Sequence, residues 1–228
     1  MSGGAVTGPV HWLTDGAHWA GENGITNRLV QHVGISALSV GICSLVAIPV
    51  ALWLGHTGRG GALAINLSNI GRAVPTFALL TLLYLVSDGV HVGGWTPSVT
   101  FLTVVALVLF GIPPLLTTTY VGMREVDRAV LDAARGMGMS GRQQLLRVEL
   151  PLATPLLLAG LRLCAVQVVA TATIAALIAG PGLGDIVTQG FGLQDYDEVV
   201  GGAVCVAVLA LAVDLGFAGI ARAARRHR

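Results

Sequence analysis

The chain has 228 residues and a net charge of +1, with 54% hydrophobic but only 11% charged residues. Soluble domains carry about 25% charged residues, so an ordinary soluble protein is a poor fit. The near-neutral charge and the absence of a basic stripe with interleaved aromatic residues give no reason to expect binding to nucleic acid.

Five apolar runs are long enough to cross a bilayer, because about 20 helical residues span its hydrocarbon layer. In chain order they are Leu29–Leu54, Ile65–Val86, Val99–Tyr120, Leu152–Ala179 and Val199–Ala221. Backbone groups in lipid must satisfy one another, which favours helices. The alternative, buried helices of a large soluble core, does not require runs of this length. We therefore predict an all-α integral membrane protein with about five transmembrane helices.

The first 28 residues lack the basic start of a signal peptide, so we expect no cleavage there. We predict an extracytoplasmic N-terminal segment, residues 1–28, followed by a transmembrane domain, residues 29–221, and a basic cytoplasmic tail, residues 222–228. Trp12 and Trp19 suit the headgroup level of the membrane.

The arginines predict the orientation of the chain, which contains no lysine. One lies between the first two runs, five lie between the third and fourth, and four follow the fifth, while the other two connections contain none. The positive-inside rule then places the N-terminus outside and the C-terminus in the cytoplasm, with Arg28 as an exception. We expect a multi-pass membrane protein.

The longest predicted cytoplasmic connection, 121–151, contains a stripe of apolar residues at helical spacing. The stripe consists of Val126, Ala129, Val130, Ala133 and Met137. Gly136 and Gly138 follow, where a helix end favours positive φ. Ser140 and Gln143 then form a capping-box pattern that predicts a second short helix. This shape suits a surface held by a partner, and periodicity alone equally allows an amphipathic loop on the membrane surface.

The same loop resembles the EAA motif of ABC importer permeases. It contains Asp132-Ala133-Ala134, then Gly138, then Val148-x-Leu150-Pro151. The usual pattern is Glu-Ala-Ala, three residues, Gly, nine residues and Ile-x-Leu-Pro. The spacings agree, and Asp for Glu and Val for Ile are the departures. The resemblance implies the type I ABC importer permease fold, with a cytoplasmic coupling helix, in a bacterial cell membrane.

In that family, the coupling helix docks in a groove of the ATPase subunit. The resemblance implies that Ala133 and Ala134 allow close approach, that Gly138 makes the turn, and that Asp132 is a polar contact or a cap. Leu150 and Pro151 close the motif where the fourth span starts. Closure of the ATPase dimer would then move the spans as rigid bodies.

We find no catalytic or metal-binding pattern in this chain. A P-loop requires a lysine, which is absent here, and the six histidines are scattered, as expected of ordinary loop and interface residues. Cys43, Cys164 and Cys205 fall in apolar runs without paired spacing, which predicts buried thiols. We expect no cofactor on this chain, with ATP and magnesium bound by a partner ATPase.

The region from Tyr120 to Phe191 looks more specifically like permeases that import glycine betaine, choline, carnitine or proline betaine. The resemblance includes Ala134-Arg135-Gly136-Met137-Gly138-Met139, Val148-Glu149-Leu150-Pro151 and Gly182-Leu183-Gly184. Permeases for methionine and other small solutes share much of this pattern and remain an alternative. A quaternary ammonium group requires an aromatic cage, and the isolated aromatics here suit a chain that receives the solute from a separate binding protein.

Two charged residues lie inside predicted spans, where charge is unfavourable. Arg162 and Asp214 are at similar depths from the predicted cytoplasmic boundary, so an interhelical ion pair is one hypothesis. A gate or cavity role for Arg162 and a subunit contact for Asp214 are the alternatives. Pro75 and Pro113 are candidates for kinks along a pathway. Thr171 is a candidate to line that pathway or to bond to a helix carbonyl.

The expected assembly contains a second permease subunit, two ATPase subunits and an extracytoplasmic substrate-binding protein, all at a lipid bilayer. Five helices are too few to enclose a gated pathway, which also favours a dimer. An ion-coupled secondary transporter is the main rival, and it needs an intramembrane carboxylate such as Asp214. A membrane scaffold or membrane-embedded enzyme is a second rival.

Overall fold

The computed structural model describes residues 4–61, 65–66, 74–88 and 97–226. Within these residues, four helical segments are long and apolar enough to cross a membrane. They are α2 (Ile25–Thr57), α5 (Val99–Arg124), the continuous helical segment Gly141–Ile178 that contains α8 (Leu150–Ala172), and Tyr196–Ala223 within α10 (Tyr196–Arg226). These four confirm the first, third, fourth and fifth predicted spans.

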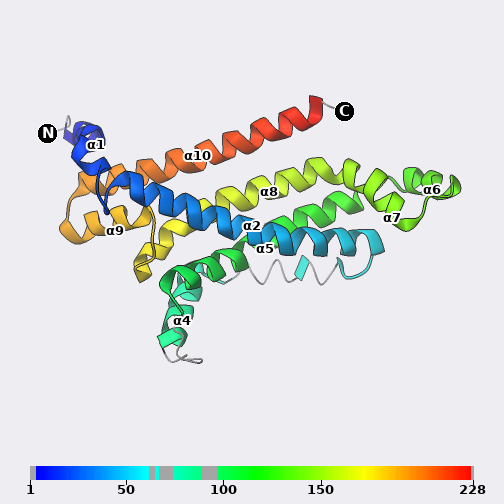
Figure 1. Ribbon diagram of the computed structural model, residues 1–228, viewed down its shortest axis with the longest axis horizontal. Coiled ribbons are helices and arrows are strands. Elements are labelled where there is room, and N and C mark those ends of the chain that lie inside the picture. The colour runs from blue at the N-terminus through cyan, green and yellow to red at the C-terminus, as the bar shows by residue number, and fades with distance from the viewer. Residues whose placement is uncertain (1–3, 62–64, 67–73, 89–96, 227–228) are drawn as a thin grey trace.

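The second predicted span, Ile65–Val86, lies partly outside the described residues. Its described part forms α4 (Thr76–Asp88), an apolar helix of 13 residues. This helix alone is shorter than the roughly 20 residues that a crossing requires. In Figure 1, α4 lies crosswise to the long helices, close to the start of α5. A fifth crossing therefore remains a prediction.

The helices α2, α5 and α8 pack along one another and form the centre of the molecule (Figure 1). They meet through small side chains, among them Cys43 and Ala47 of α2 and Cys164 of α8, all fully buried. Gly111 of α5 faces both thiols, and a side chain at this position would collide with Cys43. Small residues at such positions let helix backbones approach closely, as is typical of helices packed in membranes.

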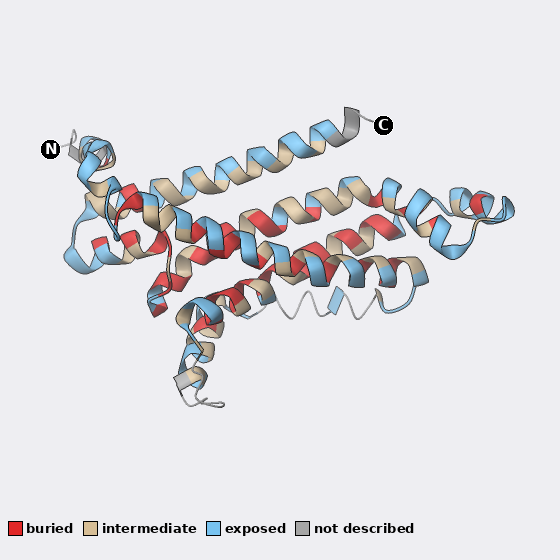
Figure 2. Cartoon of the chain, in the orientation of Figure 1, coloured by how far each residue is buried: buried red, intermediate tan, exposed pale blue. Residues whose placement is uncertain are grey.

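The outer surface of the bundle is strongly apolar. Figure 2 shows buried residues where α2, α5 and α8 meet, with exposed and half-buried residues elsewhere on these helices. Leu45 is 78% exposed and Trp53 is 63% exposed. Beyond Gly202, no residue of α10 whose burial is described is buried. Such a surface would aggregate in water, so it supports contact with lipid or with other subunits.

The N-terminal residues pack against the start of α10. They form α1 (Gly4–Thr14) and a 3₁₀ turn, Gly16–Trp19. Trp12 stacks on His18 and lies against Gly201 of α10. The predicted segment 1–28 is thus helical in part, and α2 already begins at Ile25. Arg28, the exception to the arginine pattern, forms an ion pair with Asp185 of α9 (Gly184–Leu193).

Candidate functional site

The loop between α5 and α8 projects beyond one end of the bundle (Figure 1). It contains α6 (Arg128–Gly136), α7 (Gly141–Gln144) and a π turn, Leu145–Glu149, that leads into α8. Asp127 begins α6 by accepting a hydrogen bond from the amide of Ala129 at 2.9 Å. Two short helices at this place confirm the helical interpretation of the loop.

Gly138 makes the turn after α6. Its φ is +80°, and its amide donates to the carbonyl of Arg135 at 2.9 Å. A Cβ atom at this position would have open space around it, so glycine is favoured by the backbone and not by packing. Gly136 differs from the prediction, because it is the last residue of α6 and, of these two glycines, Gly138 alone has a positive φ.

The predicted capping box starts α7. The amide of Gln143 donates to the hydroxyl of Ser140 at 3.4 Å, and the amide of Ser140 donates to the side-chain oxygen of Gln143 at 2.9 Å. Two backbone donors at the helix start are satisfied in this way. Pro151 is the second residue of α8 and follows directly after the π turn. It lacks an amide hydrogen, so it removes one donor from the helical hydrogen-bond pattern there.

The apolar stripe of α6 is largely uncovered. Ala129, Val130, Ala133 and Met137 are exposed, with Met137 73% exposed, whereas Val126 is buried. An exposed apolar stripe on a short helix is typical of a surface that another protein covers. Ala134 is only 2% exposed. It packs within the chain, so of the two motif alanines only Ala133 is exposed.

Asp132 lies on the exposed side of α6. Its carboxylate accepts a hydrogen bond from Arg135 at 3.2 Å, and both side chains are mostly exposed. Surface pairs of this kind contribute little to stability. Asp132 is not the cap of α6, since Asp127 takes that role. Of the two roles implied for Asp132, a polar contact fits its position.

Arg162 of α8 and Asp214 of α10 face each other. Nε of Arg162 donates to Oδ1 of Asp214 and Nη2 donates to Oδ2, each at 2.6 Å. This two-bond geometry gives a charge-assisted pair with a fixed orientation. The structure thus places the two side chains as the ion-pair hypothesis requires. A carboxylate engaged in this way is poorly placed to carry a coupling ion.

The proline and threonine candidates lie in different environments. Pro75 is exposed and precedes α4, where its carbonyl accepts from the amide of Leu79, so it starts a helix and does not kink one. Pro113 is buried inside α5. Thr171 is half-buried in the last turn of α8. In the same helix as Pro113, the hydroxyl of Thr118 donates to the carbonyl of Pro114 at 2.7 Å.

Two histidines have roles that the sequence did not indicate. His32 is fully buried in α2, where Nε2 donates to the carbonyl of Val169 at 3.0 Å and Nδ1 accepts from the amide of Leu183 at 3.2 Å. His56, near the end of α2, hydrogen-bonds with the buried carboxylate of Glu149 at 2.6 Å. The expectation of ordinary loop and interface histidines is therefore wrong for these two. Their polar character inside or beside apolar runs was the available signal.

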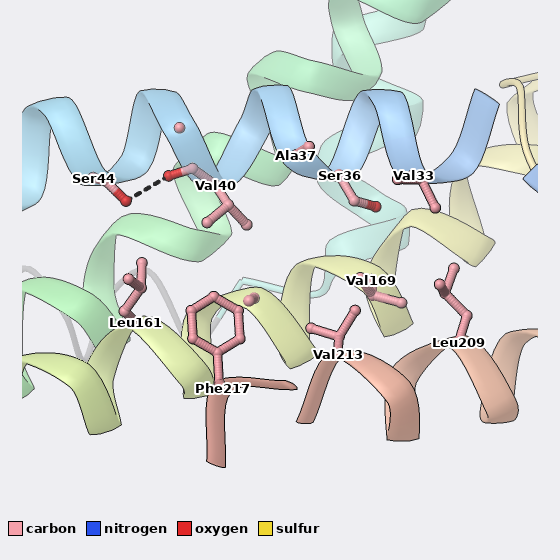
Figure 3. A pocket seen from close by; sticks show the side chains of 12 residues that line it. Val33, Ser36, Ala37, Val40, Ser44, Leu161, Val169, Leu209, Val213 and Phe217 are labelled. Carbon is pink, nitrogen blue, oxygen red and sulfur yellow. Dashed lines mark hydrogen bonds between the residues drawn. The ribbon is translucent and has the colours of Figure 1, made fainter. Parts of the chain in front are cut away.

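An apolar groove of about 390 Å³ lies between α2, α8 and α10 (Figure 3). Phe217 is the aromatic residue in its lining, which contains no charged side chain. Ser44 donates to the carbonyl of Val40, and the buried hydroxyl of Ser36 has no hydrogen-bond partner among the described residues. This lining suits apolar groups and lacks the aromatic cage that a quaternary ammonium group requires.

Comparisons with known proteins agree with this geometry. A family model described as "Binding-protein-dependent transport system inner membrane component" matches residues 47–226. The choline transport system permease protein OpuBB of Bacillus subtilis is 35% identical over 187 residues, which cover 82% of each chain. The glycine betaine/carnitine/choline transport system permease protein OpuCB of the same organism is 34% identical over 81% of each chain.

Solved structures show a similar fold. A chain of the MetNI methionine ABC transporter, in an inward facing conformation, has a TM-score of 0.74 at 20% identity and covers 95% of this chain and 98% of its own. A chain from the crystal structure of an amino acid ABC transporter with histidines has a TM-score of 0.68 at 18% identity, covering 90% of this chain and 94% of its own. At these identities the likeness supports the fold and not the solute.

Proposed function

Because this chain belongs to the family of binding-protein-dependent transport system inner membrane components, we propose that it forms the membrane pathway of an ATP-driven importer for a small osmoprotectant. It is a multi-pass membrane protein and a permease subunit. The observation that carries the proposal is the exposed apolar stripe of α6 within a loop that has the spacing of the EAA motif.

The solute class is supported by the relatives that match most of the chain. Their names specify choline, glycine betaine and carnitine, and a further relative in Escherichia coli is named for glycine betaine and proline betaine. These solutes share a quaternary ammonium group and small size. We infer the same class for this chain, with a separate extracytoplasmic binding protein that supplies the aromatic cage.

The loop between α5 and α8 supports a role in docking an ATPase. Its stripe offers apolar contact area, and Asp132 and Arg135 add exposed charge beside it. We propose that two ATPase subunits bind ATP and magnesium and dock here, one on each of two permease subunits. The permease itself is then non-catalytic and needs no cofactor of its own.

The orientation that we propose follows the arginines, with the N-terminus outside and this loop in the cytoplasm. Figure 1 supports this, because α1 lies at one end of the bundle and the loop lies at the other. The ion pair of Arg162 with Asp214 counts against the ion-coupled alternative, since it occupies the carboxylate that such a transporter would use.

Transport by purified components tests the proposal. The chain, its ATPase and its binding protein are placed in liposomes, and uptake of radiolabelled glycine betaine, choline and carnitine is measured with ATP supplied on the ATPase side. We expect uptake of at least one solute that stops with vanadate and persists when an ionophore removes the ion gradient. Uptake that follows the gradient and ignores vanadate would overturn the proposal in favour of a secondary transporter.

A further inference from the structure

A buried polar cluster joins the end of α2 to the loop between α5 and α8. Glu149, the last residue of the π turn, has a side chain that is only 5% exposed. Its Oε2 atom lies 2.6 Å from Nδ1 of His56, and its Oε1 atom accepts from Nε2 of Gln144 at 3.5 Å. Gln144 is itself 3% exposed. The end of α2 and the helical segment that leads into α8 thus meet at one carboxylate.

A buried glutamate such as Glu149 would be an unusual choice if this position only had to be packed. Removing a carboxylate from water costs free energy that its partners must offset, and an apolar side chain of similar size often packs as well or better. The π turn adds to the observation, since such turns occur frequently at functional positions in helices. Glu149 is its last residue, and the amide of Leu150 closes the turn on the carbonyl of Leu145.

The position of the cluster bears on how α2 and the loop could move relative to one another. In the chain, the loop directly joins α5 to α8. The helix α2 is not next to the loop in sequence and meets it only through non-covalent contacts. Near this end, α2 and α5 pack closely, because Gly55 lies directly against Met123. Helices packed through apolar contacts can slide past one another during domain movements. A short charge-assisted hydrogen bond instead fixes the position of two groups.

We propose that His56, Glu149 and Gln144 act as a clamp that makes α2 move together with the coupling loop. Closure of the ATPase dimer would then move α2, α5 and α8 as one unit, and the core that these helices share would stay intact. His56 and Glu149 are positioning residues in this scheme, because they act through the helices and contact no solute. The clamp rests on the proposed function, since it needs an ATPase that moves the loop.

The test measures solute uptake and ATP hydrolysis in the same liposomes containing the permease, its ATPase and its binding protein. Replacing His56 by Ala removes a hydrogen bond to a charged group, so we expect solute imported per ATP hydrolysed to fall by about tenfold. His56→Gln retains a donor and should recover most of this ratio. His11→Ala is the matched control and should leave the ratio unchanged, because it makes the same side-chain change at an exposed position of α1, at the other end of the bundle from the loop.

The outcomes separate the two proposals. If the unmodified complex imports none of glycine betaine, choline and carnitine with ATP, the proposed function fails. If it imports one of them and His56→Ala keeps the same ratio of uptake to hydrolysis, only the clamp is overturned. A fall in the ratio for His56→Ala with recovery for His56→Gln supports the clamp, because a purely structural defect would lower uptake and hydrolysis together.

A covalent link tests whether the clamp can be replaced. Cysteines replace His56 and Glu149 in a chain whose Cys43, Cys164 and Cys205 are changed to Ala, and a short bifunctional thiol reagent then joins them. The variant lacks the clamp before cross-linking, so joining α2 to the loop should raise the solute imported per ATP hydrolysed if the two must move as one unit. A ratio that does not rise on cross-linking would overturn the clamp.

Discussion

Arg162 and Asp214 form a two-bond ion pair that ties the middle of α8 to α10, with both donor–acceptor distances at 2.6 Å. Arg162→Ala leaves Asp214 without its partner, and Asp214→Ala leaves Arg162 without its partner. An unpaired charge inside a membrane is unfavourable. We expect each single change to reduce the yield of assembled permease several-fold, as measured by size-exclusion chromatography in mild detergent.

The exchanged variant, with Asp at 162 and Arg at 214, should recover much of that yield. Leu163→Ala is a control in the same turn of α8, where the leucine is 53% exposed. An exchanged variant no better than the single changes would mean that the residues act separately.

The spacing in the sequence was sufficient to predict those features that depend on neighbouring residues. The capping box of Ser140 and Gln143 and the turn at Gly138 are local, because three or four residues determine their hydrogen bonds. The long spans were predictable because the apolar runs are long. The burial of Ala134 could not be predicted, because the stripe pattern does not indicate which side of a short helix faces its own chain.

Contacts between distant segments were harder to predict. His56 and Glu149 are 93 residues apart, and His32 bonds with Leu183 across 151 residues. Nothing in their local sequence specifies these partners. Arg162 and Asp214 were the exception, because two isolated charges at matched depth in apolar runs have few alternatives to pairing.

Gly138 gives a prediction about the turn of the coupling loop. A Cβ atom at its φ of +80° costs about 1–2 kcal/mol, so Gly138→Val should distort the turn and reduce the amount of ATPase that co-purifies with the permease. Gly138→Asn should be milder, because asparagine adopts this conformation more readily. Gly136→Ala is the matched control two residues away, where a helical φ makes alanine favourable. Equal ATPase recovery from Gly138→Val and Gly136→Ala would contradict this role of the turn.

Met137 tests the exposed stripe of α6. Its side chain is 73% exposed in the isolated chain, so Met137→Glu should leave the thermal stability of the permease nearly unchanged. We expect the same change to lower ATPase co-purification strongly, because a charge would have to be buried without a partner. Met137→Leu keeps an apolar side chain and should behave like the unmodified chain. Normal ATPase recovery with Met137→Glu would place the docking surface elsewhere.

His32 is the polar residue whose removal should most affect the end of the bundle near α9. In an α-helix the carbonyl of Val169 would accept from the amide of Thr173, but α8 gives way there to a 3₁₀ turn and the amide of Thr173 donates to the carbonyl of Thr171. His32 supplies the missing donor, and its other nitrogen satisfies the amide of Leu183. His32→Ala leaves two buried backbone groups without partners, at about 1–3 kcal/mol each.

We therefore expect His32→Ala to lower the melting temperature by several degrees and to accelerate amide hydrogen exchange at Leu183. His11→Ala, at an exposed histidine of α1, should change neither quantity. His32→Gln carries one donor and one acceptor on its amide, so it should recover part of the stability if the two hydrogen bonds matter. If His32→Ala and His11→Ala melted alike and Leu183 exchanged at the same rate, the bridge would not stabilise this end of the bundle. In that case the packing of α9 against α10 alone would have to hold it.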